Sequence, residues 1–350
     1  TRIVSLTVTE KGYCHHPATR AINLEHADIA HDLAQPEAPR SAIGFIVRGL
    51  ALRRARGLPP LTLMSLDNLP ANGHTLQGLV LAFARRVDGA LADWIERGCT
   101  FPNSMVDRIV PRGDGGANVV AEPFLAWAVE DRFAAGRPDW SQGGAMFVAR
   151  AEPYEKLKLR LLNGAHSAIA YLGVQAGWPT VDVAVAQPAL ARFIDTLLRD
   201  EVAPTVAGAL PGFDLDACRA QLLRRFANPV LGHRCLQIAM DGSQKLPQRW
   251  LDTVRERLAA GAPVQRLALA VAGWLMHLRG HDEAGREFVI DDPLAAELRP
   301  LASMDAAQAL RFAPVFGALG DEPRFVAAVQ RGLGLLREYG VVAALERSPA

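Results

Sequence analysis

The sequence predicts an α/β domain followed by a mostly α-helical domain, with the boundary near residues 148–153. In residues 1–150, short β-branched and apolar runs alternate with segments whose apolar residues recur at helical spacing. In residues 151–350, helical segments follow one another and are separated by glycine and proline turn signals. A chain of 350 residues is long enough for two domains with their own cores.

The first half is expected to alternate strands and helices. Asp67 and Asn68 directly follow a buried strand, at the kind of position where open α/β sheets bind ligands. Asn68 is therefore a candidate functional residue, and the alternative is that both residues only shape a turn. The expected elements are a strand over 3–8, a helix over 39–56, a strand over 60–66, a helix from about 75 to 87 and a strand over 104–110.

The second half is expected to be helical throughout. Turn signals such as Gly177-Trp-Pro179 and Gly261-Ala-Pro263 separate the helical segments. The expected helices cover 153–177, 188–200, 215–226, 248–260 and 264–279, with a further region around 233–240 and two or three more towards residue 346.

Composition excludes several classes of partner. Half of the residues are hydrophobic, 21% are charged and the formal net charge is +1, so a nucleic-acid partner is not expected. Arginine pairs such as Arg224-Arg225 are expected on solvated helix faces. No apolar run reaches the roughly 20 residues that span a bilayer, so no membrane partner is expected. Four widely spaced cysteines are typical of the reducing cytoplasm.

One short segment carries three possible metal ligands, Cys14, His15 and His16. In an extended chain, alternate side chains point to opposite sides, so three adjacent residues do not converge on one ion. No metal site is therefore expected.

The segment 158–166 carries the strongest chemical signal. On a helix that turns about 100° per residue, Asn163 lies at about 140° and His166 at about 80° from Lys158, so all three can face one pocket. Burial would lower the pKa of the lysine and let its amine accept a proton from an alcohol. Asn163 can donate a hydrogen bond to an oxygen that gains negative charge. The alternative is an ordinary helix with a lysine that reaches solvent.

Asp107 and Arg108 lie on the last predicted strand of the first half. Adjacent side chains on a strand point to opposite faces, so each needs its own partner. Asp107 is a candidate for binding a substrate hydroxyl, and Arg108 for holding a carboxylate within the fold. Two structural ion pairs are the equally weighted alternative.

Six segments also occur in the order and at the spacing of a known family. The run Val106-Asp-Arg-Ile109 is that family's signature, and the resemblance covers nearly the whole chain. Together the segments resemble the mannitol dehydrogenase family of long-chain polyol dehydrogenases, which includes mannitol 2-dehydrogenase and fructuronate reductase. The segments are Thr9–Tyr13, Asp67–Gly73, Phe101–Ile109, Glu122–Phe124, Lys158–His166 and Asp241–Lys245.

The resemblance implies a fold and an activity. Residues 1–150 would be the C-terminal part of a Rossmann-type nucleotide-binding domain, and 151–350 an all-helical substrate and catalytic domain. The activity would be zinc-independent oxidation of a secondary alcohol with NAD, with NADP as the open alternative. Lys158 would be the general base, Asn68 and Asn163 the oxyanion donors, and His166 the residue that positions the substrate hydroxyl. Asp107, Lys245 and Arg234 would bind substrate, and Thr9, Glu10 and Val106 would bind cofactor.

The glycine-rich turn of a dinucleotide-binding domain is missing from the sequence. Such a turn joins the first strand to a helix and holds the pyrophosphate. The only glycine cluster, Gly113-Asp-Gly-Gly116, follows a proline and does not lead into a helix. The chain is therefore expected to lack the front of its cofactor domain.

The substrate expected from the resemblance is a hexuronate. Relatives that act on mannitol carry an arginine and a histidine where this chain has Gln237 and Met240. Arg234 or Lys245 could instead bind a carboxylate as a charge-assisted pair. D-mannonate and D-fructuronate are preferred, and D-mannitol and D-fructose are second. Glu155, three residues before Lys158, is expected either to relay protons to it or to form a surface ion pair.

Two rivals come from other classes. A catalytically incomplete binding module is favoured by the missing turn and opposed by the intact set of Lys158, Asn163 and His166. A zinc-dependent polyol dehydrogenase is disfavoured, because the sequence has no clustered cysteine and histidine ligands.

Overall fold

The protein is described by a computed structural model that covers residues 1–16, 19–111 and 119–348. Its contacts divide the chain into two compact units. The first unit is Thr1–Arg108 with Pro123–Glu155, and the second is Ile109–Glu122 with Lys156–Ala350. The glycine cluster at 113–116 lies outside the described residues. Among the described helices, none is both long and apolar enough to cross a membrane.

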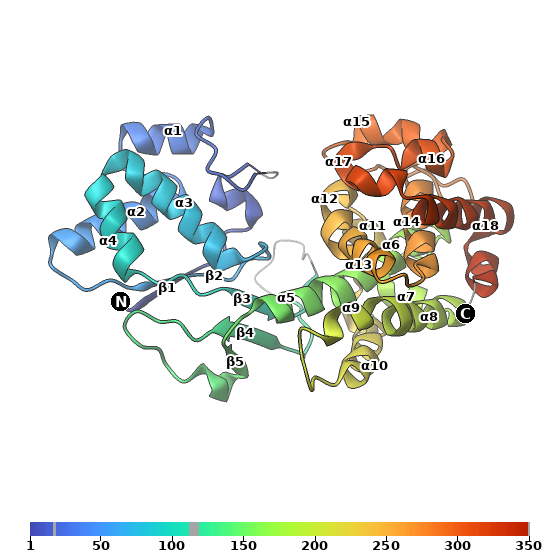
Figure 1. The fold of residues 1–350 in the computed structure, drawn as a ribbon, viewed down its shortest axis with the longest axis horizontal. Coiled ribbons are helices and arrows are strands. Elements are labelled where there is room, and N and C mark those ends of the chain that lie inside the picture. Colours follow the sequence, from blue (N-terminus) through green and yellow to red (C-terminus); the bar gives the residue numbers. More distant parts are fainter. Residues whose placement is uncertain (17–18, 112–118, 349–350) are drawn as a thin grey trace. The chain divides into compact units, whose positions relative to one another are not determined.

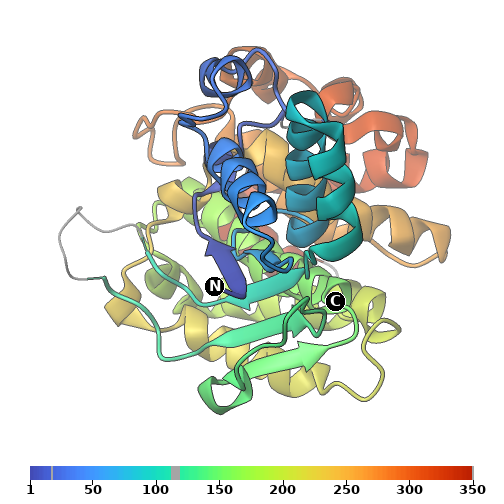
Figure 2. The ribbon, with the colours of Figure 1, turned by 90° about the vertical axis from the view of Figure 1, so that its left-hand side faces the viewer.

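The first unit combines helices with two small sheets (Figure 1). Strands β1 and β2 pair in parallel, whereas β3 pairs antiparallel with β4, which pairs in parallel with β5. Figure 2 shows β3, β4 and β5 side by side below the blue and teal helices. The elements are β1 (Ile3–Leu6), η1 (Glu10–Tyr13), α1 (Ala27–Ala34), α2 (Ala42–Ala55), β2 (Thr62–Ser65), α3 (Asn72–Val87), α4 (Gly89–Gly98), β3 (Ser104–Asp107), β4 (Ala126–Glu130), η2 (Trp140–Gly143) and β5 (Ala145–Val148).

The core of the first unit lies between β2 and its helices. All four residues of β2 are buried, as the apolar run in the sequence predicts. The predicted apolar face of α2 is also confirmed, because Ile43, Ile46, Val47 and Leu50 are buried in the same core. Helix α3 packs against both α2 and β2. The α/β prediction for the first half therefore holds.

The predicted elements differ from the observed ones mainly at their ends. Helix α3 begins at Asn72, three residues earlier than predicted, and β3 ends at Asp107 and not at residue 110. The early start of α3 has a physical reason, because Asn72 is buried and its side chain bonds two strand ends. Its Nδ2 donates to the carbonyl oxygens of Ser65 and Ser104, both at 2.9 Å, and its Oδ1 accepts from Ser104 N–H at 2.8 Å.

The second unit is helical throughout, as the sequence predicts (Figure 1). Helix α5 (Glu152–Leu157) crosses the boundary between the units. The elements that follow are η3 (Lys158–Asn163), α6 (Gly164–Gln175), α7 (Val181–Val185), α8 (Pro188–Thr196), η4 (Leu197–Val202), α9 (Pro204–Ala207), α10 (Leu215–Phe226), η5 (Pro229–Leu231), α11 (Cys235–Ile238), α12 (Gly242–Leu246), η6 (Pro247–Leu251), α13 (Asp252–Ala259), α14 (Gln265–His277), α15 (Ala295–Leu298), η7 (Arg299–Ser303), α16 (Ala306–Ala309), α17 (Ala313–Phe316), η8 (Gly317–Asp321) and α18 (Pro323–Arg347).

Helix α14 is the centre of the second unit. Every residue from Arg266 to His277 is buried, and the helix packs against α6 and α18. All twelve residues of α6 are buried as well. Gly273 permits the close approach of α14 to α6, because a β-carbon there would lie 2.9 Å from Leu172 Cδ2. A helix buried on all sides is expected at the core of a large helical domain.

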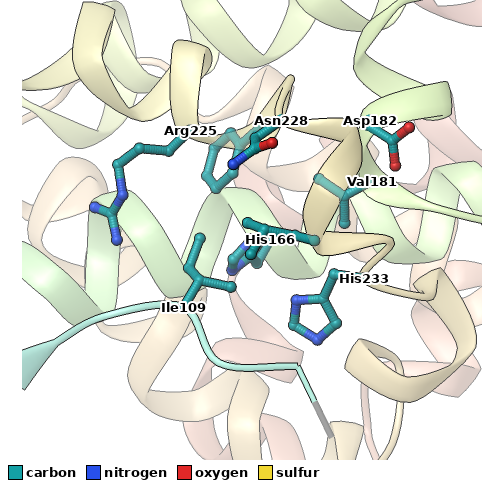
Figure 3. Close-up of a pocket in the computed structure, with 9 residues that line it drawn as sticks. Ile109, His166, Val181, Asp182, Arg225, Asn228 and His233 are labelled. Atoms are coloured by element: carbon teal, nitrogen blue, oxygen red, sulfur yellow. The ribbon is translucent and has the colours of Figure 1, made fainter. Parts of the chain in front are cut away.

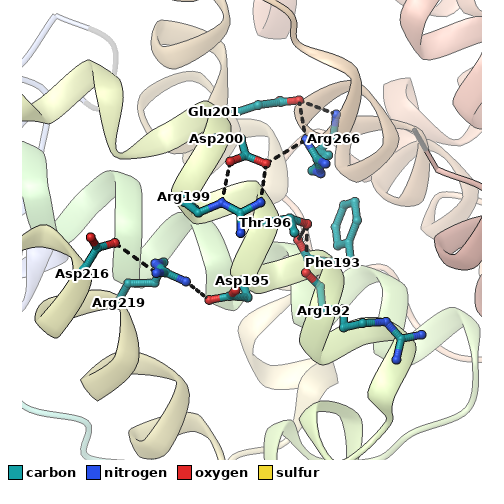
Figure 4. A network of polar contacts seen from close by, with 10 residues as sticks. All are labelled: Arg192, Phe193, Asp195, Thr196, Arg199, Asp200, Glu201, Asp216, Arg219 and Arg266. Carbon is teal, nitrogen blue, oxygen red and sulfur yellow. Dashed lines mark hydrogen bonds and ion pairs between the residues drawn. The ribbon is translucent and has the colours of Figure 1, made fainter. Parts of the chain in front are cut away.

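A buried carboxylate fixes the start of α14. Glu201, 1% exposed, accepts hydrogen bonds from the N–H groups of Arg266 and Leu267, both at 2.9 Å (Figure 4). These N–H groups have no partner within the helix, and the helix dipole favours negative charge at this end. Burial raises the pKa of Glu201, and the two hydrogen bonds oppose that rise. The guanidinium of Arg266 contacts Asp200, the residue before Glu201. Arg199 also forms an ion pair with Asp200.

A second buried ion pair joins Glu122 to α10 within the helical unit. The guanidinium of Arg225 on α10 donates to both carboxylate oxygens of Glu122, at 2.9 and 2.7 Å. The exposed fractions of the two residues are 8% and 2%. Glu122 also accepts from the N–H of Ile109 at 2.5 Å. The prediction that Arg225 lies on a solvated helix face is therefore wrong, because helix periodicity places the adjacent Arg224 in solvent and turns Arg225 inward.

We expect Asn72→Ala to destabilise the first unit. The substitution leaves the main-chain groups of Ser65 and Ser104 without these hydrogen bonds in a buried setting, which costs about 2–4 kcal/mol in the free energy of unfolding. Urea titration of both proteins measures the difference. Asn23→Ala is the matched control, because Asn23 caps one exposed turn through Glu25 N–H and its loss costs about 1 kcal/mol or less. Equal effects of the two substitutions would contradict the role given to Asn72.

We expect Arg225→Met to cost about 3–5 kcal/mol in the free energy of unfolding, because Glu122 is left as a buried charge. The double variant Glu122→Leu with Arg225→Met removes both charges, so it should lose less than the single variant. Arg224→Met is the matched control, since its side chain is exposed one residue away. Urea unfolding of the four proteins tests this. If the double variant were less stable than Arg225→Met, the ion pair would stabilise the fold by more than the neutralisation of two buried charges.

Candidate active site

Lys158 and Asn163 stand at the two ends of a π-helix, η3, and His166 follows in α6. In a π-helix each N–H reaches the carbonyl five residues back, so one turn holds more residues than the 3.6 of an α-helix. The angular offsets that an α-helix predicts for these three residues are therefore wrong over residues 158–163. Single π turns within helices are frequent at functional sites.

An ion pair between buried Arg160 and exposed Glu256 sets the orientation of η3. Arg160 is 5% exposed and donates to both carboxylate oxygens of Glu256 on α13, at 2.7 and 2.6 Å. Lys156 contacts the same carboxylate at 3.1 Å. The hydrogen bond from Arg160, and the one from Lys156, lower the pKa of Glu256 despite its partial burial. One face of η3 is thereby fixed to α13, which determines where Lys158 and Asn163 lie around the helix axis.

A second π-helix, η6, holds the other end of η3. Arg249 Nη1 donates to Ser167 Oγ at 2.8 Å and lies 3.4 Å from the carbonyl oxygen of Asn163. Trp250 Nε1 donates to the carbonyl oxygen of Gly164 at 2.9 Å. Sequence reasoning missed both residues. The only signal for them is a tryptophan and an arginine at the start of a predicted amphipathic helix, a pattern that does not show which backbone they bond.

His166 is buried, with 7% of its surface exposed. Its ring lies 4.5 Å from the Phe226 ring and 5.6 Å from the His233 ring, centroid to centroid. Burial, followed by the charges of His233, Arg249 and Arg225, lowers the pKa of His166 well below its usual value. The imidazole is therefore neutral near pH 7, with one ring nitrogen that donates and one that accepts.

A small cavity adjoins His166. Figure 3 shows His166 between Ile109 and His233, with Arg225 and Asn228 along another wall. The cavity has a free volume of about 10 Å³, which leaves room for about one water molecule. Burial, and then the ammonium group of Lys245, lowers the pKa of His233. Both histidines beside this cavity therefore favour their neutral forms.

Lys158 and Asn163 are both half-buried. Lys158 is therefore partly removed from water and partly exposed, a position that fits both a proton-accepting lysine and one that reaches solvent. Its role as a proton acceptor stays a prediction. The described hydrogen bonds of Glu155 join its carboxylate to the N–H of Ala71, at 3.2 and 3.3 Å. The structure thus gives Glu155 a role within the first unit.

The predicted substrate-binding cations lie around the short helix α11. Lys245 Nζ donates to the carbonyl oxygen of Met240 at 2.5 Å and lies 3.8 Å from Asp241 Oδ2. Arg234 precedes the first residue of α11 and is exposed. Gln237 and Met240 are half-buried. Of these two cations, Lys245 is the one whose charge lowers the pKa of His233, and Arg234 is exposed.

In the first unit, the carboxyl ends of the parallel strands β1 and β2 lie together. Asp67 joins them, because its carboxylate accepts from the N–H groups of Val8 and Thr9 at 3.1 and 3.0 Å and from Tyr13 Oη at 2.7 Å. Thr9 has a φ of 62°, an unusual conformation for a β-branched residue. The predicted site residues Thr9, Glu10 and Asn68 are exposed at these strand ends. Sequence reasoning assigned Asp67 only a turn role.

Around the end of β3, the burial of successive residues alternates. Val106 is half-buried, Asp107 is 8% exposed and Arg108 is exposed. Val106 and Asp107 pair with Trp127 and Ala126 of β4. The prediction that Asp107 and Arg108 face opposite sides is confirmed. Arg108 is exposed, and its predicted role in holding a carboxylate stays a prediction.

Comparison with known proteins assigns the chain to a family. The mannitol dehydrogenase Rossmann domain profile matches residues 2–142, and the mannitol dehydrogenase C-terminal domain profile matches residues 150–336. D-mannonate oxidoreductase of Escherichia coli strain K12 is 47% identical over 86% of this chain, and mannitol 2-dehydrogenase of Phaeosphaeria nodorum is 39% identical over 99%. The matches span 65% and 64% of those two relatives.

Solved structures agree with the sequence comparison. Mannitol 2-dehydrogenase of Pseudomonas fluorescens, in a ternary complex with NAD and D-mannitol, superposes with a TM-score of 0.84 and 38% identity. That match covers 99% of this chain and 74% of the other. A D-sorbitol dehydrogenase in substrate-free form gives a TM-score of 0.90 at 34% identity, over 98% of this chain and 74% of the other. The chain belongs to the mannitol dehydrogenase family.

Proposed function

We propose that this chain belongs to an NAD-dependent, zinc-independent dehydrogenase that interconverts a sugar alcohol or aldonate with its ketose. The preferred pair is D-mannonate and D-fructuronate. The observation that carries the proposal is the segment η3–α6, on which Lys158, Asn163 and a buried, neutral His166 lie within nine residues of one another. An amine, an amide donor and a neutral imidazole are the groups that alcohol oxidation requires.

Each of these residues has a distinct role in the proposed reaction. The Lys158 amine accepts the hydroxyl proton during alcohol oxidation, and its ammonium form returns a proton to the oxygen during ketone reduction. The Asn163 amide donates to the oxygen as negative charge develops, an interaction typically worth about 3–4 kcal/mol in barrier height. The neutral His166 ring orients the substrate hydroxyl. A nicotinamide cofactor, when bound, supplies the hydride acceptor and donor.

The first unit has features that fit a dinucleotide. Open α/β sheets bind such ligands beyond the carboxyl ends of parallel strands. Asp67 holds the ends of β1 and β2 together, and Thr9, Glu10 and Asn68 are exposed there. We propose these residues, with Val106 at β3, as the part of the cofactor site that this chain supplies. NAD is the proposed cofactor, in line with the ternary complex of the Pseudomonas fluorescens relative.

The preference for a hexuronate rests on charge. The cationic groups of Lys245, Arg249 and Arg225 act on the His166–His233 cluster, as the lowered pKa values of both histidines indicate. Arg225 is paired with Glu122, and we propose Lys245 and Arg249 as the cations that bind an anionic substrate. The similarity to D-mannonate oxidoreductase also supports a hexuronate substrate. D-mannitol and D-fructose are the second candidate pair, because the Pseudomonas fluorescens relative binds D-mannitol.

We also propose a cytoplasmic location. All four cysteines are free thiols, and three of them are buried. Reduced cysteines are usual where glutathione and thioredoxin keep thiols reduced.

We expect Lys158→Ala to lower kcat by at least roughly 100-fold, the usual effect of losing a general acid–base group. Added primary amines should restore part of the rate, because a small amine can enter the space left by the side chain. Steady-state kinetics with and without amine measures both effects. Lys156→Ala is the matched control, because Lys156 only pairs with Glu256. If Lys158→Ala retained the wild-type rate, the segment would be structural and not catalytic.

We expect the wild-type protein to reduce D-fructuronate with a higher kcat/KM than D-fructose. Both substrates carry a ketone beside hydroxyl groups, so the terminal carboxylate must provide the discrimination. One charge-assisted hydrogen bond is worth about 1.5–3 kcal/mol, or roughly one to two decades. Lys245→Met should reduce the preference for D-fructuronate by that factor. It should lower kcat/KM for D-fructose less than kcat/KM for D-fructuronate.

Arg234→Ala separates the two candidate cations, because Arg234 is exposed and should leave the preference nearly unchanged. If Arg234→Ala reduced the preference for D-fructuronate and Lys245→Met did not, Arg234 would be the residue that binds the substrate carboxylate. A wild-type preference for D-fructose would replace the hexuronate assignment with D-mannitol and D-fructose.

A further inference from the structure

Three side chains with metal-binding atoms meet in the first unit, and none of them has a role in the proposed reaction. The ligand atoms of Cys14, His26 and Asp28 all lie within 4.8 Å of one another. The local sequence predicts no metal site here, because the adjacent Cys14, His15 and His16 do not converge on one ion in an extended chain. The structure separates Cys14 from those neighbours and brings it together with residues twelve and fourteen positions later.

The backbone explains how these three residues meet. Cys14 has a φ of 50°, in the left-handed region, and this conformation turns the chain at the end of η1. The chain then returns, because Asn23 N–H donates to the carbonyl oxygen of Cys14 at 3.0 Å. His26 stands directly before α1, and its Nδ1 accepts from Asp28 N–H at 3.3 Å. Cys14 is therefore held beside the first turn of α1.

The charges around Cys14 favour a cation. Asp32 is fully buried, and its carboxylate already accepts from Arg40 N–H, Ser41 N–H and Ser41 Oγ. It thus contributes negative charge without being a ligand. A divalent ion would offset this charge and stabilise the thiolate.

We propose that Cys14, His26 and Asp28 bind one Zn²⁺ ion, with the fourth position for water. Sulfur, imidazole nitrogen and carboxylate oxygen together suit zinc and not calcium or magnesium, which prefer oxygen alone. Tetrahedral zinc ligands lie roughly 3.3–3.8 Å apart, so the observed atoms need to close by about 1 Å. The side chains of His26 and Asp28 are 38% and 45% exposed and can make this movement, whereas Cys14 is buried and fixed.

The ion would be structural and independent of the proposed dehydrogenase chemistry. Cys14 follows Tyr13, whose hydroxyl contacts Ser65 Oγ at 2.6 Å and donates to Asp67 at 2.7 Å. Metal binding therefore fastens α1 to the turn that Asp67 holds at the carboxyl ends of β1 and β2. The site stabilises that turn in the absence of substrate and cofactor, and this separates its test from any test of activity.

Cobalt titration of the metal-free protein tests the site. Co²⁺ takes a similar tetrahedral set of ligands, and its bond to a thiolate gives a charge-transfer absorption band. We expect this band to saturate at one equivalent of Co²⁺ and to disappear on addition of Zn²⁺. Zinc should also raise the Tm of the wild-type protein, by an amount that grows with the logarithm of the free Zn²⁺ concentration above the dissociation constant. Saturation without a thiolate band, or a band that needs several equivalents, would overturn the proposal.

Substitutions identify the ligands. Cys14→Ser should abolish the band, while Cys218→Ser, at a half-buried thiol of the other unit, should preserve it. His26→Asn keeps a side chain that can cap α1, and Asp28→Asn keeps the size of the exposed carboxylate. Each should weaken Co²⁺ binding by more than roughly 100-fold, beyond the usual effect of an outer-shell change. Wild-type affinity in His26→Asn or Asp28→Asn would show that the substituted residue is not a ligand, and a band retained in Cys14→Ser would show that another thiol binds the ion. Either result would overturn the proposal.

Discussion

The position of the proposed catalytic residues depends on how the carbonyl oxygens at the end of η3 are bonded. Arg249 and Trp250 reach the carbonyl oxygens of Asn163 and Gly164 from η6, a second π-helix. Arg160 holds the other side of η3 through Glu256. A π turn is less regular than an α turn and is sustained only where its surroundings favour it. The contacts from η6 and α13 supply that support, and they fix the directions in which Lys158 and Asn163 leave the helix.

The charged side chains around His166 and His233 differ in their surroundings. Buried Arg225 is matched by buried Glu122, so this pair adds little net charge. Half-buried Lys245 donates to the carbonyl oxygen of Met240 and lies 3.8 Å from Asp241 Oδ2, and half-buried Arg249 donates to Ser167 Oγ. The charge of Lys245 lowers the pKa of His233, and the charge of Arg249 lowers the pKa of His166. The same cations are the ones proposed to bind a carboxylate-bearing substrate, so in that proposal one arrangement would both disfavour protonation of the imidazoles and attract an anion.

Local sequence patterns were enough to predict much of the fold. The apolar face of α2, the buried run of β2 and the helical second half follow from periodicity, and the structure confirms them. The grouping of Lys158, Asn163 and His166 on one helical segment was also predictable from spacing. Their angular positions were not, because an α-helical wheel does not describe a π turn. Nothing in residues 158–163 alone indicates that η6 lies beside them.

Contacts with residues elsewhere in the chain explain the features that local sequence patterns did not predict. Arg225 resembles a solvated arginine until Glu122, 103 residues away, is placed beside it. Cys14 resembles part of an adjacent Cys-His-His group until a left-handed residue turns the chain towards α1. In both cases the local pattern is ordinary, and the partner comes from elsewhere in the chain. A single sequence contains the partners but not their pairing.

The strand ends of the first unit place structural polar residues beside a proposed functional one. Asp67 and Asn72 use their side chains to bond the main chain around β1, β2 and β3, and Asn72 is buried. Asn68, between them in sequence, is exposed. A polar group fully engaged by the backbone gains rigidity and loses the capacity to bind a ligand. In the proposed site, Asp67 and Asn72 would therefore fix the turn, and Asn68 would act from that fixed turn.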